Sequence, residues 1–127
     1  MALGKIKADT LEHSTAGSLD TKFVVEGSAK AWVNYNQATP IVNSSLNNSS
    51  VTDSSAGRFN VNFTSVFSGA NEYNWSGMSQ SGSGTAYNST IQMDGTPTTA
   101  FGSYETVFNN NTFSDLSNGV TIHGDLA

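Results

Sequence analysis

Short stretches in which apolar and polar residues alternate recur along this chain. The clearest is residues 59–64, where Phe59, Val61 and Phe63 share one face and polar side chains occupy the other. Residues 31–36 alternate in the same way. Because successive side chains of a strand point to opposite faces, this period of two predicts β-strands with one buried face.

Less regular stretches of the same kind predict further strands, at residues 23–25, 71–76, 87–93, 103–108 and 120–122. Turn-forming residues gather between them, at 47–50, 53–57, 81–84, 94–97 and 109–111. Strands about ten residues apart with such turns are typical of antiparallel sandwiches and barrels. The sequence therefore predicts an all-β fold, an antiparallel β-sandwich or barrel-like domain of about seven or eight strands, with almost no helix signal.

The first twenty residues differ from the rest. Their apolar residues are sparse, chiefly Ile6, Leu11 and Leu19, and follow no sustained period. Such a segment cannot bury enough surface by itself to offset the entropy lost on ordering. It is either a frayed tail, which composition alone favours, or an extended arm that orders against a neighbouring subunit. We predict a division into an N-terminal segment, residues 1–20, and a single β-domain, residues 21–127.

The composition indicates a surface that is polar but carries few charges. Ser, Thr and Asn supply 47 of the 127 residues, whereas charged residues make up only 12%. Five Lys and Arg against ten Asp and Glu leave no basic patch to neutralise phosphates, so nucleic acid is not an expected partner. No apolar run reaches the 18 residues or so of a membrane span, and residues 1–7 lack the apolar stretch of a signal peptide.

The residues that usually carry chemistry form no recognisable pattern. The chain has no cysteine, and its two histidines, His13 and His123, lie far apart in the sequence. The loop at residues 53–57 lacks the further acidic ligands of a calcium loop. Neither a phosphate-binding glycine motif nor a nucleophile elbow is present. We therefore predict no catalytic residue, no metal site and no cofactor, and a protein that is not an enzyme.

The aromatic residues support two interpretations. Trp32, Tyr35, Trp75 and Tyr104 could form a platform for sugars, or they could fill a core that is short of aliphatic side chains. The second interpretation is favoured for the set as a whole. Trp32 is the exception, because it shares its strand face with asparagines, which places it on a wet surface or beneath another subunit.

Three segments resemble a known family. They read KADTLEHSTAGSLDTKFVV at residues 7–25, GSAKAWVNY at 27–35 and SSVTDSSAGRFNVNF at 49–63. This series resembles small virion proteins and tail-fibre-associated domains of tailed phages, especially those of marine and cyanobacterial hosts. The resemblance covers residues 7–67, about half of the chain.

The resemblance implies a structural component of a phage particle, made in the host cytoplasm and located in the virion. It implies a part of a tail fibre or appendage, or its attachment to the particle, with capsid decoration (a cement protein) as the alternative. It also favours an ordered N-terminal arm over a frayed tail. The expected partners are further copies of the chain, with a trimer favoured by analogy with fibres, and other virion proteins. The residues expected to make these contacts are Ile6, Leu11, Leu19 and Trp32.

Two other functions remain open from the sequence. A module that binds host-surface glycan would need at least two of the rings Trp32, Tyr35, Trp75 and Tyr104 in one exposed groove. A glycan-cleaving enzyme would need two carboxylates about 5–10 Å apart in a cleft. The carboxylates available for such a pair are Asp9, Glu12, Glu26, Asp53, Glu72, Asp94, Glu105, Asp115 and Asp125.

Overall fold

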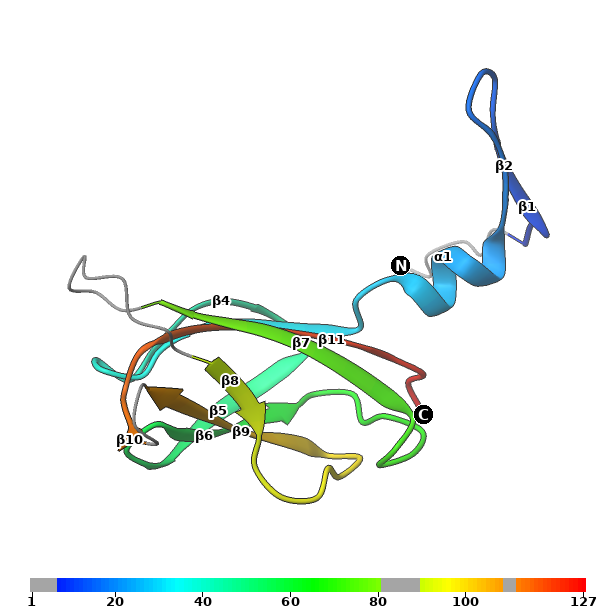
Figure 1. Ribbon diagram of the computed structural model, residues 1–127. Coiled ribbons are helices and arrows are strands. Elements are labelled where there is room, and N and C mark those ends of the chain that lie inside the picture. Colours follow the sequence, from blue (N-terminus) through cyan, green and yellow to red (C-terminus); the bar gives the residue numbers. More distant parts are fainter. Residues whose placement is uncertain (1–6, 81–89, 109–111) are drawn as a thin grey trace, which may run out of the picture.

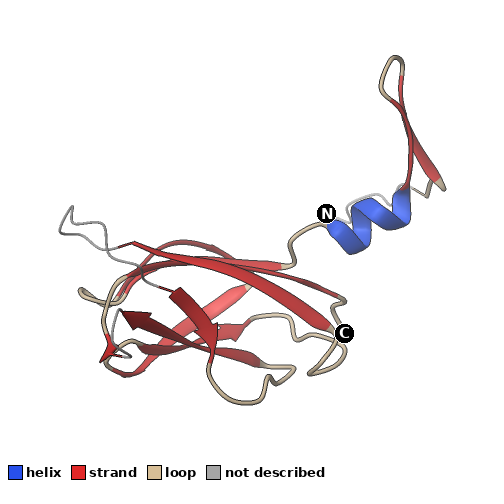
Figure 2. Cartoon of the chain, viewed as in Figure 1, coloured by secondary structure: helices blue, strands red, loops and turns tan. Residues whose placement is uncertain are grey.

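A computed structural model describes residues 7–80, 90–108 and 112–127 of the chain. It has two parts, a β-sandwich and an arm that projects from one end of it (Figure 1). Strands form most of the described residues, and the helix lies in the arm (Figure 2). The prediction of an all-β fold with antiparallel sheets is confirmed.

The first sheet has four antiparallel strands. Their order across the sheet is β4 (Ile41–Leu46), β3 (Ala31–Asn36), β11 (Ser117–Gly124) and β7 (Tyr73–Gln80). Strand β11 pairs on one side with β3, with Val120 opposite Val33, and on the other side with β7. Strands β4 and β7 therefore form the two edges of this sheet.

The second sheet lies against the first. Strand β6 (Arg58–Phe63) pairs with β5 (Asn48–Ser55) and with β9 (Phe101–Phe108), and β9 also pairs with β8 (Thr90–Met93) and the short β10 (Thr112–Phe113). At one side of the sandwich, β4 passes into β5 through Asn47 alone, which adopts a left-handed backbone with φ of 51°.

The core lies between the sheets and is rich in aromatic rings. From the first sheet, Tyr35 lies 5.3 Å from Phe59 of the second, measured between ring centroids. Phe59 in turn neighbours Tyr104, and Trp75 meets Tyr104 edge-on at 5.2 Å. Buried aliphatic side chains complete the core, among them Val33, Val61, Val120 and Ile122.

Buried polar groups also join the two sheets. The hydroxyl of Thr106 on β9 donates to the side-chain oxygen of Asn118 on β11, at 3.0 Å, and both side chains are buried. The amide of Asn118 donates to the carbonyl of Leu116 at 3.0 Å. Because a buried polar group is costly without a partner, these bonds fix how the sheets face one another.

The stretches of alternating apolar and polar residues correspond to strands of the sandwich. The predicted strands at residues 31–36, 59–64 and 103–108 correspond to β3, β6 and β9, and those at 71–76 and 120–122 lie largely or wholly within β7 and β11. The predicted strand at 87–93 is described only from Thr90, where β8 begins. Strands β4 and β5 were not predicted. Residues 41–46 have no regular alternation of apolar and polar residues, and residues 47–50 and 53–57, most of which lie in β5, were predicted as turns.

Residues 23–25 were predicted as a strand, and this prediction is wrong: they lie in helix α1 (Thr21–Gly27). The arm consists of a hairpin, β1 (Thr10–His13) with β2 (Gly17–Asp20), followed directly by α1. It therefore extends beyond the boundary expected at residue 20, and the strands of the sandwich begin at Ala31 (Figure 1). Within the described ranges no helix has both the length and the apolar character needed to cross a membrane.

The turn between β5 and β6 supports a test of the fold. Gly57 has φ of 68°, and a Cβ at this position would stand 2.6 Å from the backbone nitrogen of Ser114. We expect Gly57→Ala to lower the free energy of unfolding by about 3 kcal/mol or more, because backbone strain adds to a clash with backbone that cannot move away.

Gly95→Ala is the matched control, since Gly95 also has a positive φ, of 79°, but has open space around it. Its expected cost is the backbone strain alone, about 1–2 kcal/mol. Urea unfolding of both variants measures the difference. Equal losses at the two positions would contradict the packing described for Gly57.

Candidate assembly surface

The hairpin of the arm brings together two residues that the sequence predicted as contacts. In its register Leu11 stands directly opposite Leu19, so both side chains lie on the same face. Leu11 is 50% exposed and Leu19 is 48% exposed. Ile6, the third predicted contact in this segment, lies outside the described residues.

Hydrogen bonds at the base of the hairpin set the direction in which α1 starts. The backbone nitrogen of Thr21 donates to the carbonyl of Asp9 at 2.9 Å, and the Thr21 hydroxyl donates to the carbonyl of Ala8 at 2.6 Å. The carboxylate of Asp20 accepts from the backbone nitrogen of Lys22 and so caps the helix. The hairpin and α1 therefore form one folded unit.

Helix α1 contributes the rest of the apolar surface of the arm and has no buried residue. Val24 is 39% exposed and Val25 is 59% exposed. Both line a largely apolar recess of about 540 Å³ that Leu11 and Lys7 also border. We call Leu11, Leu19, Val24 and Val25 the arm's apolar face.

The arm is attached to the sandwich at the end of β11. The backbone nitrogen of Lys30 donates to the carbonyl of Ile122 at 2.8 Å, and Nδ1 of His123 lies 3.0 Å from the carbonyl oxygen of Gly27. The ammonium of Lys30 donates to the Val25 carbonyl and to the Ser28 hydroxyl. These bonds hold the end of α1 beside the sandwich and leave the apolar face uncovered.

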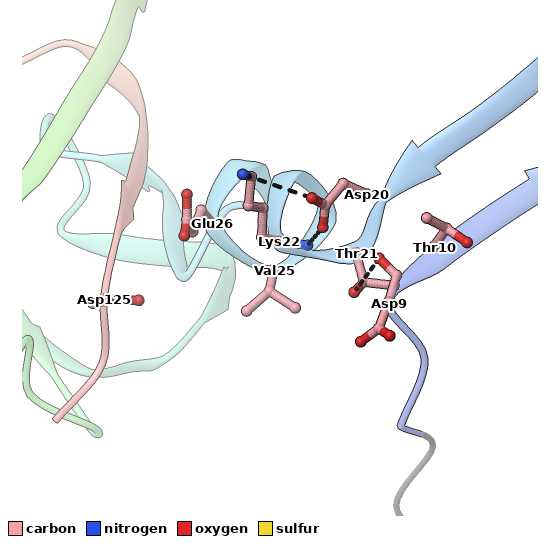
Figure 3. A pocket seen from close by; sticks show the side chains of 8 residues that line it. All are labelled: Asp9, Thr10, Asp20, Thr21, Lys22, Val25, Glu26 and Asp125. Atoms are coloured by element: carbon pink, nitrogen blue, oxygen red, sulfur yellow. Dashed lines mark hydrogen bonds and ion pairs between the residues drawn. The ribbon is translucent and has the colours of Figure 1, made fainter.

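Carboxylates gather where the arm meets the sandwich. Figure 3 shows Asp9, Asp20, Glu26 and Asp125 around an open recess. Lys22 forms an ion pair with Asp20 at 3.6 Å, and both side chains are largely in solvent, where such a pair contributes little to stability.

A neighbouring recess is bordered by Glu26 and Asp125 together with Glu72. In the described part of the chain no group of three or more acidic, histidine or cysteine side chains is arranged to hold a metal ion.

Other candidate carboxylates serve as structural acceptors. Glu105 lies 3.0 Å from Nε of Arg58, and Asp94 lies 3.5 Å from the same nitrogen. Asp115 accepts from the backbone nitrogen of Gly57 at 2.7 Å, and Asp53 accepts from the amide of Gln37 at 3.0 Å. These four carboxylates anchor strands and turns.

The four rings considered as a glycan platform do not share a surface. Tyr35 and Tyr104 are buried in the core, and Trp75 packs against Tyr104 from the inner face of β7. Trp32 lies on the opposite, outer face of its sheet, half-buried, with Leu46 and Thr121 as its neighbours on the adjacent strands. The alternative prediction that these four rings form one exposed platform is therefore wrong, since three of them pack in or against the core.

The sequence did not reveal that residues 23–25 belong to the arm's surface. A helix signal was present, because Asp20 is a favourable N-cap residue at the point where the helix begins. The short run Phe23-Val24-Val25 masked it, since β-branched and aromatic residues favour strands. In α1 all three side chains remain exposed, and Val24 and Val25 border the same recess as Leu11.

No protein-family model, no curated protein and no solved structure matches the chain.

Tyr104 allows a test of the core that contains these rings. Its hydroxyl is buried with no hydrogen-bond partner among the described residues. We expect Tyr104→Phe to be at least as stable as the parent at pH 7, and more stable by up to about 1 kcal/mol, because it removes an unsatisfied polar group and keeps the ring. Urea unfolding measures this, and a variant less stable by over about 1 kcal/mol would contradict it.

The same variant should respond less to alkaline pH. Burial raises the pKa of Tyr104 above its ordinary value of 10.0, so the folded chain keeps a proton that the unfolded chain releases above that pH. The free energy of unfolding should therefore be unaffected by this group below pH 10 and fall as the pH rises beyond it, by up to about 1.4 kcal/mol per pH unit. In Tyr104→Phe the free energy of unfolding should no longer fall with pH on account of residue 104. Burial also raises the pKa of Tyr73, and the contribution of Tyr73 to the pH dependence should remain in the variant.

Proposed function

We propose that this protein is a non-enzymatic assembly protein, in which the β-sandwich is a rigid body and the arm joins it to other protein. The observation that carries the proposal is the arm's apolar face, folded outside the sandwich and left uncovered. The proposed mechanism is protein–protein contact through this face, with no chemical step.

The size of the arm supports a role in contact. A two-stranded hairpin and a helix of seven residues are each marginal on their own in water. Burying a fully exposed Leu or Val contributes about 1.5–3 kcal/mol, and these four side chains are about half exposed, so covering each contributes roughly half as much. A partner over all four would therefore stabilise both the contact and the arm. An exposed apolar surface on a folded unit is characteristic of an interaction site.

The resemblance of residues 7–67 supports placing this assembly in a phage particle. We propose a virion protein of a tail fibre or appendage, with capsid decoration as the alternative position. Its proposed partners are further copies of itself, a trimer being favoured, and other virion proteins. The surface rich in Ser, Thr and Asn suits an external part that stays soluble with few charges.

Glycan binding remains a second candidate on different residues. On the outer face of the first sheet, Asn34, Met78, Gln80 and Gly119 border a shallow recess of about 340 Å³. Amide groups beside an apolar side chain suit a sugar, whose hydroxyls need hydrogen bonds and whose ring needs apolar contact. Binding on a glycan array that Asn34→Ala abolishes would support this candidate, and an array without binding would exclude it.

The first test of assembly combines Leu11→Asp with Leu19→Asp. We expect the parent to be an oligomer in solution and the double variant to have a lower mass, because two carboxylates would have to be buried in the contact. Light scattering measures the mass. At a protein concentration at which the parent is also dissociated, thermal unfolding should change little, since both leucines lie outside the core.

Met78→Asp is the matched control, because Met78 is 81% exposed on the sandwich and lies outside the arm. It should leave the mass unchanged. Limited proteolysis gives a second readout: cleavage before Thr21 should be slow in the oligomer and fast in the double variant. A parent that stays monomeric at all concentrations, with the arm cut as fast as in the variant, would overturn the proposed function.

A further inference from the structure

Strand β4 of the sandwich is exposed along its whole length. All six of its residues are exposed, and in the described residues its only strand partner is β3. Its apolar side chains are 54% exposed at Ile41, 37% at Val42 and 47% at Leu46. An exposed apolar edge of this kind is a ready template for pairing with another chain.

Both faces of β4 are exposed. Leu46 stands opposite Trp32 on the outer face of the sheet. Val42 stands opposite Tyr35, whose ring is buried in the core, so Val42 is on the inner side and yet in solvent. Strand β4 therefore extends past the cover that the second sheet provides.

A recess continues this surface at the Leu46 end of the strand. It has a volume of about 520 Å³, and its apolar border includes Ala29, Leu46 and Leu126. Leu126 is itself 40% exposed. We call β4 together with this recess the β4 surface.

The distribution of charge indicates what covers the β4 surface. All four lysines of the chain lie within residues 1–30, where four carboxylates balance them. Residues 31–127 hold one arginine and six carboxylates, a net charge of −5. Two sandwiches brought face to face would repel, whereas an arm without net charge meets the negative sandwich without that cost. One lysine, Lys7, and one carboxylate, Asp9, border the recess beside Leu11 and Val24, so this part of the arm carries no net charge.

We propose that the arm of one copy lies on the β4 surface of a second copy. This inference rests on the proposed function and specifies its partner. Hairpin strands β1 and β2 have no other strand partner in the described ranges, so one of them can add to the free edge of β4 by backbone hydrogen bonds. Leu11, Leu19, Val24 and Val25 then cover the apolar side chains of β4. The contact is head to tail, which generates a closed ring when the rotation between copies closes.

Engineered cysteines test the contact directly, because the chain has none of its own. Ser18→Cys places a thiol in the hairpin, and Ser45→Cys places one on β4. Both serines are exposed, so neither change removes a core contact. When the two single variants are mixed, unfolded, refolded together and oxidised, we expect the main product to be a disulfide that joins the hairpin thiol of one copy to the β4 thiol of another.

Ser76→Cys is the matched control, since Ser76 is an exposed serine on β7, the opposite edge of the same sheet. Mixed with Ser18→Cys, it should give at least about tenfold less cross-linked product. Val42→Asp gives an independent readout: it should weaken association at least about tenfold. Thermal unfolding of the dissociated protein should change little, because Val42 lies outside the core.

The outcomes separate this inference from the proposed function. An oligomer that cross-links chiefly between two Ser18→Cys chains would place arm against arm and overturn the β4 contact, while assembly through the arm would stand. An oligomer unaffected by Val42→Asp would also overturn it. A parent protein without self-association would overturn the proposed assembly with further copies, and the β4 contact with it.

Discussion

The packing of aromatic rings across the two sheets is the interaction on which the rest of the molecule depends. Tyr35 of the first sheet meets Phe59 of the second at a ring separation of 5.3 Å, and Trp75 meets Tyr104 at 5.2 Å. The chain has only six leucines and four isoleucines, and Ile122 and Leu116 are the ones buried in the described residues. Each buried ring removes roughly 150–250 Å² from water, so the rings supply most of the core.

This dependence limits what the surface can do. Rings that hold the sheets together are not available to stack on a ligand, which is why the four rings form no shared platform and three of them lie in or against the core, as the favoured interpretation of the sequence predicts. The outer faces are left to Ser, Thr and Asn, whose side chains bond to nearby backbone, as Asn47 does with Ser65. Against this polar background, the exposed apolar side chains of the arm and of β4 differ from their surroundings.

The sequence predicted the strands that the core needs. In β3 and β6 every second residue is buried. Because these buried positions require apolar side chains, the sequence of each strand has a period of two. Strands β4 and β5 face water along most of their length and carry no such constraint, and their composition resembles that of turns. Strand β4 forms because it pairs with β3, and strand β5 because it pairs with β6. This pairing depends on the tertiary structure and leaves no local pattern in the sequence.

The candidate site was predicted in part for a related reason. Leu11 and Leu19 are the apolar residues of a polar segment, which marked them as contacts, but only the register of the hairpin shows that they face the same way. The helical state of residues 23–25 depends on the cap at Asp20 and on the bonds of Thr21 to the hairpin base. No core residue requires a strand there, so local capping decided the structure against the β-propensity of the side chains.

The position of the arm is consistent with the proposed contact to a second copy. The arm enters the sandwich at Lys30, and Leu46 of β4 stands opposite Trp32, two residues further along. Helix α1, about 10 Å long, separates the hairpin from this point and directs it away from the sandwich (Figure 1). A chain built in this way does not cover its own β4 surface with its own hairpin. If each copy gives an arm and receives one, the arm's apolar face and the β4 surface are both covered in every copy of a closed ring.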